Sequence, residues 1–145
     1  MKKILFTCVL IFFSEQFFAQ SNTSHTIQHN GITREYKIYV PAIYNGSTAV
    51  PLVFNLHGYT SNNTEQEYYG NFRPIADTAN FIIVHPNGTL DGGGNRYWNA
   101  FGNPGVDDVG FLSLLIDEIN ADYNIDLNRV YSTGMSNGGY MSYEL

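Results

Sequence analysis

The sequence predicts an α/β fold, in which a mostly parallel sheet begins with an antiparallel hairpin. Apolar runs typical of buried strands occur at residues 51–56, 81–85 and 129–133. Segments with the apolar spacing of helices separate these runs, and strands that alternate with helices favour a parallel sheet. We find no internal repeat and expect one domain.

The hairpin is expected over residues 26–40. Asn30 and Gly31 lie at its centre, and this pair accepts the positive φ angles of a two-residue turn. Apolar and mixed side chains alternate in the second half of the hairpin, which predicts a strand with one apolar face. Pro41 ends this strand.

Two buried strands and two short helices are expected next. Pro51 to Leu56 is a nearly continuous apolar run, as in a strand covered on both faces. Helical segments are expected at 64–69 and 74–79, and a further strand at 81–85. The polar stretch from Thr89 to Val106 is predicted to be a long loop, and loops of this length are usually functional.

An amphipathic helix is expected from Asp107 to Tyr123. Its apolar stripe consists of Leu112, Leu115, Ile116, Ile119 and Tyr123. Asp107 and Asp108 suit the start of a helix, where carboxylates cap free N–H groups and face the positive end of the helix dipole. We interpret both as capping residues, with the role of a catalytic acid as the alternative.

Residues 134–138 form a Gly-x-Ser-x-Gly pentapeptide between the last strand and a C-terminal helix. This context predicts a nucleophile elbow, in which the serine adopts a strained conformation above the sheet edge. Gly134 and Gly138 lack the Cβ atoms that would collide at such a turn. The pattern predicts the N-terminal part of an α/β-hydrolase fold that stops just after the elbow, with Ser136 as catalytic nucleophile.

A serine nucleophile requires stabilisation of the oxyanion that develops on the substrate. In this fold one backbone N–H comes from the residue after the serine, here Asn137, and the other from the loop after the third strand. His57, Gly58 and Tyr59 occupy that loop, and Gly58 allows a close approach. We predict the N–H groups of Tyr59 and Asn137 as the oxyanion hole.

The chain offers no convincing general base. His57 precedes the serine, whereas the acid and then the histidine follow it in this fold. We therefore assign His57 to the substrate-binding side, where orienting the oxyanion loop is its expected role, and we interpret His85 as structural. The acid and the histidine are expected beyond Leu145, and the chain as given is expected to be inactive alone.

The first 19 residues have the layout of a secretory signal peptide: a basic start, an apolar run and cleavage expected after Ala19. Residues 20–145 are then the N-terminal portion of a catalytic domain that is secreted to the extracellular space or the periplasm. Cys8 is the only cysteine and leaves with the signal, so no disulfide is expected.

Charge and motif content exclude several classes of partner. The formal net charge is −6, which argues against nucleic acid and, after signal cleavage, against a membrane. The glycine triplet at residues 92–94 lacks the Gly-Lys-Ser/Thr ending of a phosphate loop. Paired histidines at His25 and His29 without a third ligand do not indicate a metal site.

Short motifs occur in a fixed order along the chain: Leu56-His57-Gly58, Trp98-Asn99, Val106 to Phe111, Arg129 to Tyr131 and Gly134 to Gly139. Together they resemble the secreted esterase and polyhydroxybutyrate depolymerase family, which includes feruloyl and acetylxylan esterases. The resemblance implies ester hydrolysis through an acyl-serine, with no metal or organic cofactor. It also implies that Trp98 lines the substrate-binding cleft, with a core or loop-anchoring tryptophan as the alternative.

The leading hypothesis is a secreted serine carboxylic-ester hydrolase whose substrate is a polysaccharide-linked feruloyl or acetyl ester or a polyhydroxyalkanoate. Within the same fold, a prolyl-oligopeptidase-like serine peptidase is the alternative, although such enzymes usually carry a large domain ahead of the hydrolase. The alternative from a different class is a non-catalytic secreted carbohydrate-binding protein on a hydrolase scaffold.

Overall fold

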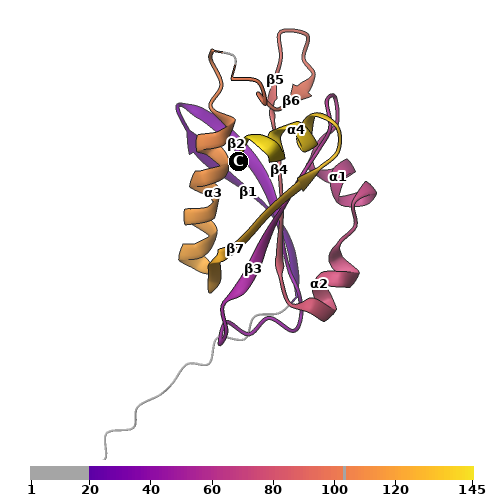
Figure 1. The fold of residues 1–145 in the computed structure, drawn as a ribbon, viewed down its shortest axis with the longest axis vertical. Coiled ribbons are helices and arrows are strands. Elements are labelled where there is room, and N and C mark those ends of the chain that lie inside the picture. Colours follow the sequence, from indigo (N-terminus) through magenta and orange to yellow (C-terminus); the bar gives the residue numbers. More distant parts are fainter. Residues whose placement is uncertain (1–19, 103) are drawn as a thin grey trace, which may run out of the picture.

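A computed structural model describes residues 20–102 and 104–145; the predicted signal peptide, with Cys8, lies outside this part. Five strands form a mixed sheet in the order β1-β2-β4-β3-β7. β2 pairs antiparallel with β1 and β4, whereas β3 is parallel to β4 and β7. The predicted α/β class is confirmed (Figure 1). The strands are β1 (Ser21–His29), β2 (Ile32–Val40), β3 (Val50–Leu56), β4 (Ile82–Pro86) and β7 (Ile125–Gly134).

The turn between β1 and β2 has the backbone that an Asn-Gly pair predicts. Asn30 has φ 49° and Gly31 has φ 78°, as a two-residue hairpin turn requires. The pairing extends to Val40 opposite Ser21. β1 therefore begins at Ser21 rather than at the predicted Thr26.

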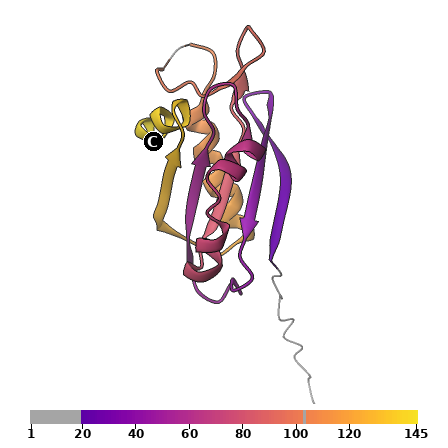
Figure 2. The ribbon, with the colours of Figure 1, turned by 90° about the vertical axis from the view of Figure 1, so that its right-hand side faces the viewer.

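Helices cover both faces of the sheet (Figure 2). α1 (Asn63–Tyr69) and α2 (Arg73–Ala79) lie on one face, and α3 (Asp108–Asp122) lies on the other. A sheet covered on both faces explains why the strands at 51–56 and 81–85 are nearly continuous apolar runs.

The main core lies between the sheet and α3. Val84 of β4 belongs to this core, whereas the adjacent Ile83 points to the opposite face and packs against α2, as the alternation of strand side chains requires. On α3, Phe111 is fully buried although the predicted stripe lacked it. Ile116 and Tyr123, which the stripe included, are partly buried.

The two aspartates at the start of α3 have different roles. Asp107 is the N-cap residue, and its Oδ1 accepts the N–H of Gly110 at 2.8 Å. Asp108 Oδ1 instead accepts from Arg34 Nη2 at 2.6 Å, with both side chains almost fully buried. Asp107 caps the helix as predicted. Asp108 lies in the first turn as predicted but does not cap it, because a guanidinium on β2 neutralises this carboxylate within the core.

The carboxyl ends of β3, β4 and β7 meet at one edge of the sheet, at the top of Figure 1. This edge carries α4 (Asn137–Glu144) and a short hairpin made of β5 (Thr89–Leu90) and β6 (Arg96–Tyr97). The hairpin lies inside the stretch that was predicted to be loop only. None of the described helices is long and apolar enough to cross a membrane.

A buried polar cluster joins β3, β4 and α1. His85 is 1% exposed, and its Nε2 lies 3.2 Å from Asn55 Nδ2. Asn55 also donates to the Gly70 carbonyl at 2.9 Å and accepts from Gln66 Nε2 at 2.7 Å. Burial lowers the pKa of His85 to about 4, so this imidazole is neutral at physiological pH and has the structural role predicted for it.

The neutral, buried His85 makes stability depend on pH. Because its folded pKa of about 4 lies below the unfolded value, the unfolded state binds a proton first as the pH falls. The free energy of unfolding should decrease from about pH 6.5 down to about pH 4, by up to roughly 1.4 kcal/mol per pH unit. Urea denaturation of the complete protein across this range measures the slope.

A His85→Gln variant should show a shallower slope over the same pH range, whatever its stability at neutral pH. His25→Gln, at an exposed position of β1, controls for the loss of a surface histidine. If the His85→Gln variant kept the slope of the parent protein, His85 would not be the cause of this pH dependence.

Candidate active site

Ser136 lies at the sharp turn between β7 and α4. Its backbone has φ 51° and ψ −112°, a region that non-glycine residues adopt only at a cost in strain. A Cβ on Gly134 would lie 2.6 Å from the Gly138 carbonyl carbon, and a Cβ on Gly138 would lie 2.4 Å from the Leu56 carbonyl oxygen. The predicted elbow geometry is therefore confirmed, and both glycines are required by sterics.

The Ser136 side chain is on the outside of the molecule, not in the core. The residue is exposed, and in the part of the chain that the structure describes its hydroxyl makes no hydrogen bond. A hydroxyl in this position is free to meet a base and a substrate carbonyl from solvent.

The loop after β3 passes directly against the elbow. A Cβ on Gly58 would lie 3.0 Å from Met135 Cε and 3.8 Å from Ser136 Cβ. Thr60, with φ 68°, donates its N–H to the Arg96 carbonyl at 2.9 Å, which ties the loop to β6. The structure thus brings the predicted oxyanion loop beside Ser136.

The two predicted oxyanion donors are available for a ligand. Within residues 20–102 and 104–145, neither the Tyr59 N–H nor the Asn137 N–H donates to a protein acceptor. For Asn137 this follows from its place in the first turn of α4, where N–H groups have no partner within the helix. Their role in an oxyanion hole stays a prediction.

His57 is fully buried, and both of its ring nitrogens are engaged. Gly88 N–H donates to Nε2 at 2.9 Å, so the proton of the neutral ring is on Nδ1, which donates to the Gly58 carbonyl at 2.7 Å. Burial lowers the pKa of His57. The ring orients the loop that carries Gly58; a direct contact between His57 and substrate does not fit this geometry.

Trp98 is also fully buried, so the structure favours the loop-anchoring interpretation over a place in the cleft wall. Its indole Nε1–H donates to the His57 carbonyl at 2.9 Å. Its backbone N–H and carbonyl pair with the Asn137 side chain at 2.6 Å and 3.0 Å. These long-range contacts have no signal in the local sequence.

Asp108 is committed to a structural role that sequence reasoning missed. Besides its bond to Arg34, its Oδ2 accepts the Asn99 N–H at 2.7 Å. Arg34 also donates to the Asn87 carbonyl at 3.0 Å, and its guanidinium lies 3.8 Å from the centroid of the Phe111 ring. Asp108 therefore holds the segment that contains Trp98, and it is not free to act as a catalytic acid.

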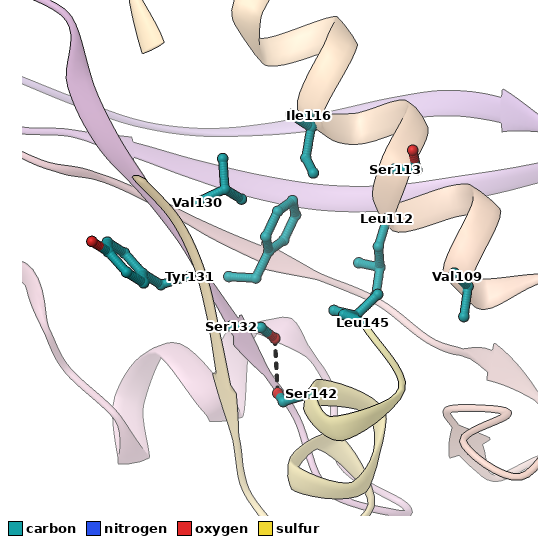
Figure 3. Close-up of a pocket in the computed structure, with 10 residues that line it drawn as sticks. Val109, Leu112, Ser113, Ile116, Val130, Tyr131, Ser132, Ser142 and Leu145 are labelled. Atoms are coloured by element: carbon teal, nitrogen blue, oxygen red, sulfur yellow. Dashed lines mark hydrogen bonds between the residues drawn. The ribbon is translucent and has the colours of Figure 1, made fainter. Parts of the chain in front are cut away.

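A groove beside α4 is separate from the nucleophile. It has a volume of about 460 Å³ and lies between α3, β7 and α4, with Leu112, Val130 and Leu145 among its apolar walls (Figure 3). The Ser132 and Ser142 hydroxyls hydrogen-bond at 2.8 Å on one side of it. Ser136 does not line this groove, so the candidate site is the strand-end surface around the elbow.

No group of three or more histidine, cysteine, aspartate or glutamate side chains that could hold a metal ion occurs among the described residues. The His29 Nε2 and Asp107 Oδ2 atoms lie 3.2 Å apart, but two side chains do not make up such a group. His29 is partly buried, and its ring lies near that of Phe111 on α3.

The steric requirement for glycine at position 138 predicts a large mutational effect. Gly138→Ala places a Cβ 2.4 Å from the Leu56 carbonyl oxygen and 2.5 Å from the His57 carbonyl oxygen. We expect a loss of more than about 2 kcal/mol in the free energy of unfolding of the complete protein, measured in urea.

Gly92→Ala is the matched control, because a Cβ there would meet nothing within 4 Å. The free energy of unfolding of this variant should stay within about 0.5 kcal/mol of the parent value. Equal stability of the two variants would show that the elbow is less crowded than the geometry requires.

The sequence of the chain is similar to the sequences of known esterases. The chain is 32% identical over 116 residues to the bifunctional acetylxylan esterase/xylanase XynS20E of Neocallimastix patriciarum, covering 80% of the chain and 16% of the relative. It is 33% identical over 119 residues to a probable feruloyl esterase C of Aspergillus terreus, covering 77% of the chain and 40% of the relative. The chain thus spans less than half the length of either relative.

The fold matches solved hydrolases as well. An S-formylglutathione hydrolase from Agrobacterium tumefaciens superimposes with a TM-score of 0.70 at 17% identity, covering 86% of this chain and 52% of that one. The family model described as Esterase PHB depolymerase matches residues 34–145. With the elbow and the Leu-His-Gly loop both inside that match, the chain belongs to the esterase PHB depolymerase family.

Proposed function

We propose that the protein is a serine hydrolase of carboxylic esters that acts through an acyl-serine at Ser136. The observation that carries this proposal is the strained, exposed Ser136, with φ 51°. The free N–H groups of Tyr59 and Asn137 on the two adjacent segments support it. Family membership favours an ester rather than an amide as the substrate bond.

In this reaction the Ser136 Oγ attacks the ester carbonyl carbon while a base removes its proton. The carbonyl oxygen becomes an oxyanion and accepts hydrogen bonds from the Tyr59 and Asn137 N–H groups, each donor being worth about 3–4 kcal/mol in the transition state. The C–O bond to the alcohol then breaks, and the alcohol leaves with the proton. Water hydrolyses the acyl-serine by the same steps in reverse order.

We place the general base and its acid outside the described residues. His57 and His85 are buried and hydrogen-bonded, whereas His25 and His29 belong to β1, the edge strand farthest from β7. In this proposal the complete protein supplies both groups, and residues 20–145 alone do not turn over substrate.

We propose a polysaccharide-linked feruloyl or acetyl ester, or a hydroxyalkanoate polyester, as the substrate. The names of the two relatives and of the family support these classes. Exposed aromatic rings next to the elbow fit them: Phe101 and Tyr140 lie 5.5 Å apart between ring centroids, and Tyr140 N–H donates to the Ser136 carbonyl at 3.0 Å. The basic and apolar pattern of residues 1–19 supports secretion.

A fluorophosphonate probe should label the complete protein at Ser136, and the protein should hydrolyse p-nitrophenyl acetate and methyl ferulate. Ser136→Ala should abolish labelling and lower ester turnover by at least about 10⁴-fold. Peptide mapping of the labelled residue and the initial rates provide the measurements.

Ser132→Ala is the control, because this serine lies on β7, the strand that leads into the elbow, but is hydrogen-bonded to Ser142. It should retain labelling and turnover. Hydrolysis of a peptidyl amide in place of the esters would indicate a peptidase, and a complete protein without labelling at Ser136 would indicate a binding protein.

A further inference from the structure

The Asn137 side chain pairs with the backbone of a residue far away in the sequence. Its Oδ1 accepts the Trp98 N–H at 2.6 Å, and its Nδ2 donates to the Trp98 carbonyl at 3.0 Å. A carboxamide that bonds both the N–H and the carbonyl of one residue offers the same acceptor and donor that the backbone of a neighbouring strand would offer. Two such bonds fix the orientation of Asn137 as well as its distance from Trp98.

Trp98 makes a second connection through its indole. Nε1–H donates to the His57 carbonyl at 2.9 Å, and the centroids of the indole and imidazole rings are 5.1 Å apart. His57 Nδ1 in turn donates to the Gly58 carbonyl at 2.7 Å, which is the carbonyl of the peptide bond whose N–H belongs to Tyr59. One buried tryptophan is therefore bonded to both segments that carry the proposed oxyanion donors.

Trp98 is itself held in place through the next residue in the chain. The next residue, Asn99, donates its N–H to Asp108 at 2.7 Å and its Nδ2–H to the Val106 carbonyl at 2.8 Å. Asp108 is paired with Arg34 at 2.6 Å in the core. The segment thus rests on α3 and β2, two elements that do not take part in the elbow.

We propose that Trp98 and the Asn137 side chain form a clamp that sets the separation and orientation of the Tyr59 and Asn137 N–H groups. Both are positioning residues for transition-state stabilisation, and neither contacts the substrate through its side chain. This inference rests on the proposed ester hydrolysis. Its physical basis is that an oxyanion hole is effective only when its donors are held in place before charge develops.

The test uses two conservative variants of the complete protein. Trp98→Phe keeps a buried ring but removes the Nε1–H bond to His57, and Asn137→Ala removes both bonds to Trp98 while leaving its own N–H. We expect each to lower kcat for p-nitrophenyl acetate by about 10- to 100-fold, with KM within about threefold of the parent value, because the lost interaction acts in the transition state.

A transition-state analogue separates positioning from general loss of structure. A trifluoromethyl ketone forms a hemiketal with Ser136 whose oxygen occupies the oxyanion hole, so its inhibition constant should rise by about the same factor as kcat falls. The double variant should lose little more than the worse single variant, because the two side chains act as one unit. Ile83→Ala, in the core on the α2 face, should destabilise the protein but leave kcat and the inhibition constant within about twofold.

The outcomes distinguish the clamp from the proposed function. An active parent protein whose Trp98→Phe and Asn137→Ala variants lose stability but keep kcat and inhibitor affinity would overturn the clamp alone. A complete parent protein with neither turnover nor labelling at Ser136 would overturn the proposed function and the clamp with it.

Discussion

The close approach of the elbow to the carboxyl end of β3 is the constraint on which the rest of the site depends. Met135 N–H donates to the Leu56 carbonyl at 3.1 Å, and that same carbonyl oxygen would lie 2.4 Å from a Cβ on Gly138. The elbow packs so closely against β3 that a Cβ at position 138 has no room, and Ser136 is held there at φ 51° and ψ −112°. Strain of about 1–3 kcal/mol at such a residue persists only where the surrounding packing holds it, and here the parallel pairing of β3 with β7 does so.

Parallel strands also explain why distant segments meet at this point. β3, β4 and β7 all end at the same edge, so the residues that follow them become neighbours. His57 follows β3 and Gly88 lies two residues after β4, and the bond between His57 Nε2 and Gly88 N–H at 2.9 Å ties the two strand ends together. The sheet therefore supplies the scaffold, while the loops that leave it carry the groups that we propose to be functional.

Much of this architecture could be predicted because its signals are local. The Asn-Gly pair predicts a turn, and the alternation of apolar and polar side chains predicts which face of a strand is buried. The Gly-x-Ser-x-Gly spacing predicts an elbow. The roles of Asp108 and Trp98 could not be predicted, since each is set by partners far away in the sequence: Arg34 for the aspartate, and His57 and Asn137 for the tryptophan. The strands of the β5–β6 hairpin have two residues each, which is too short for an alternation signal.

The network around Trp98 contributes to geometry more than to stability. A satisfied hydrogen bond in a protein interior adds only about 1 kcal/mol, because the same groups bind water when unfolded, whereas an unsatisfied one is costly. The Trp98 N–H, carbonyl and indole N–H all have partners, as do both nitrogens of His57. Apolar side chains packed at these positions would be buried to a similar extent, but they would not fix the direction of the neighbouring backbone N–H groups. In the proposed oxyanion hole, the polar network would supply the orientation of the N–H groups beside Ser136 that apolar packing alone does not give.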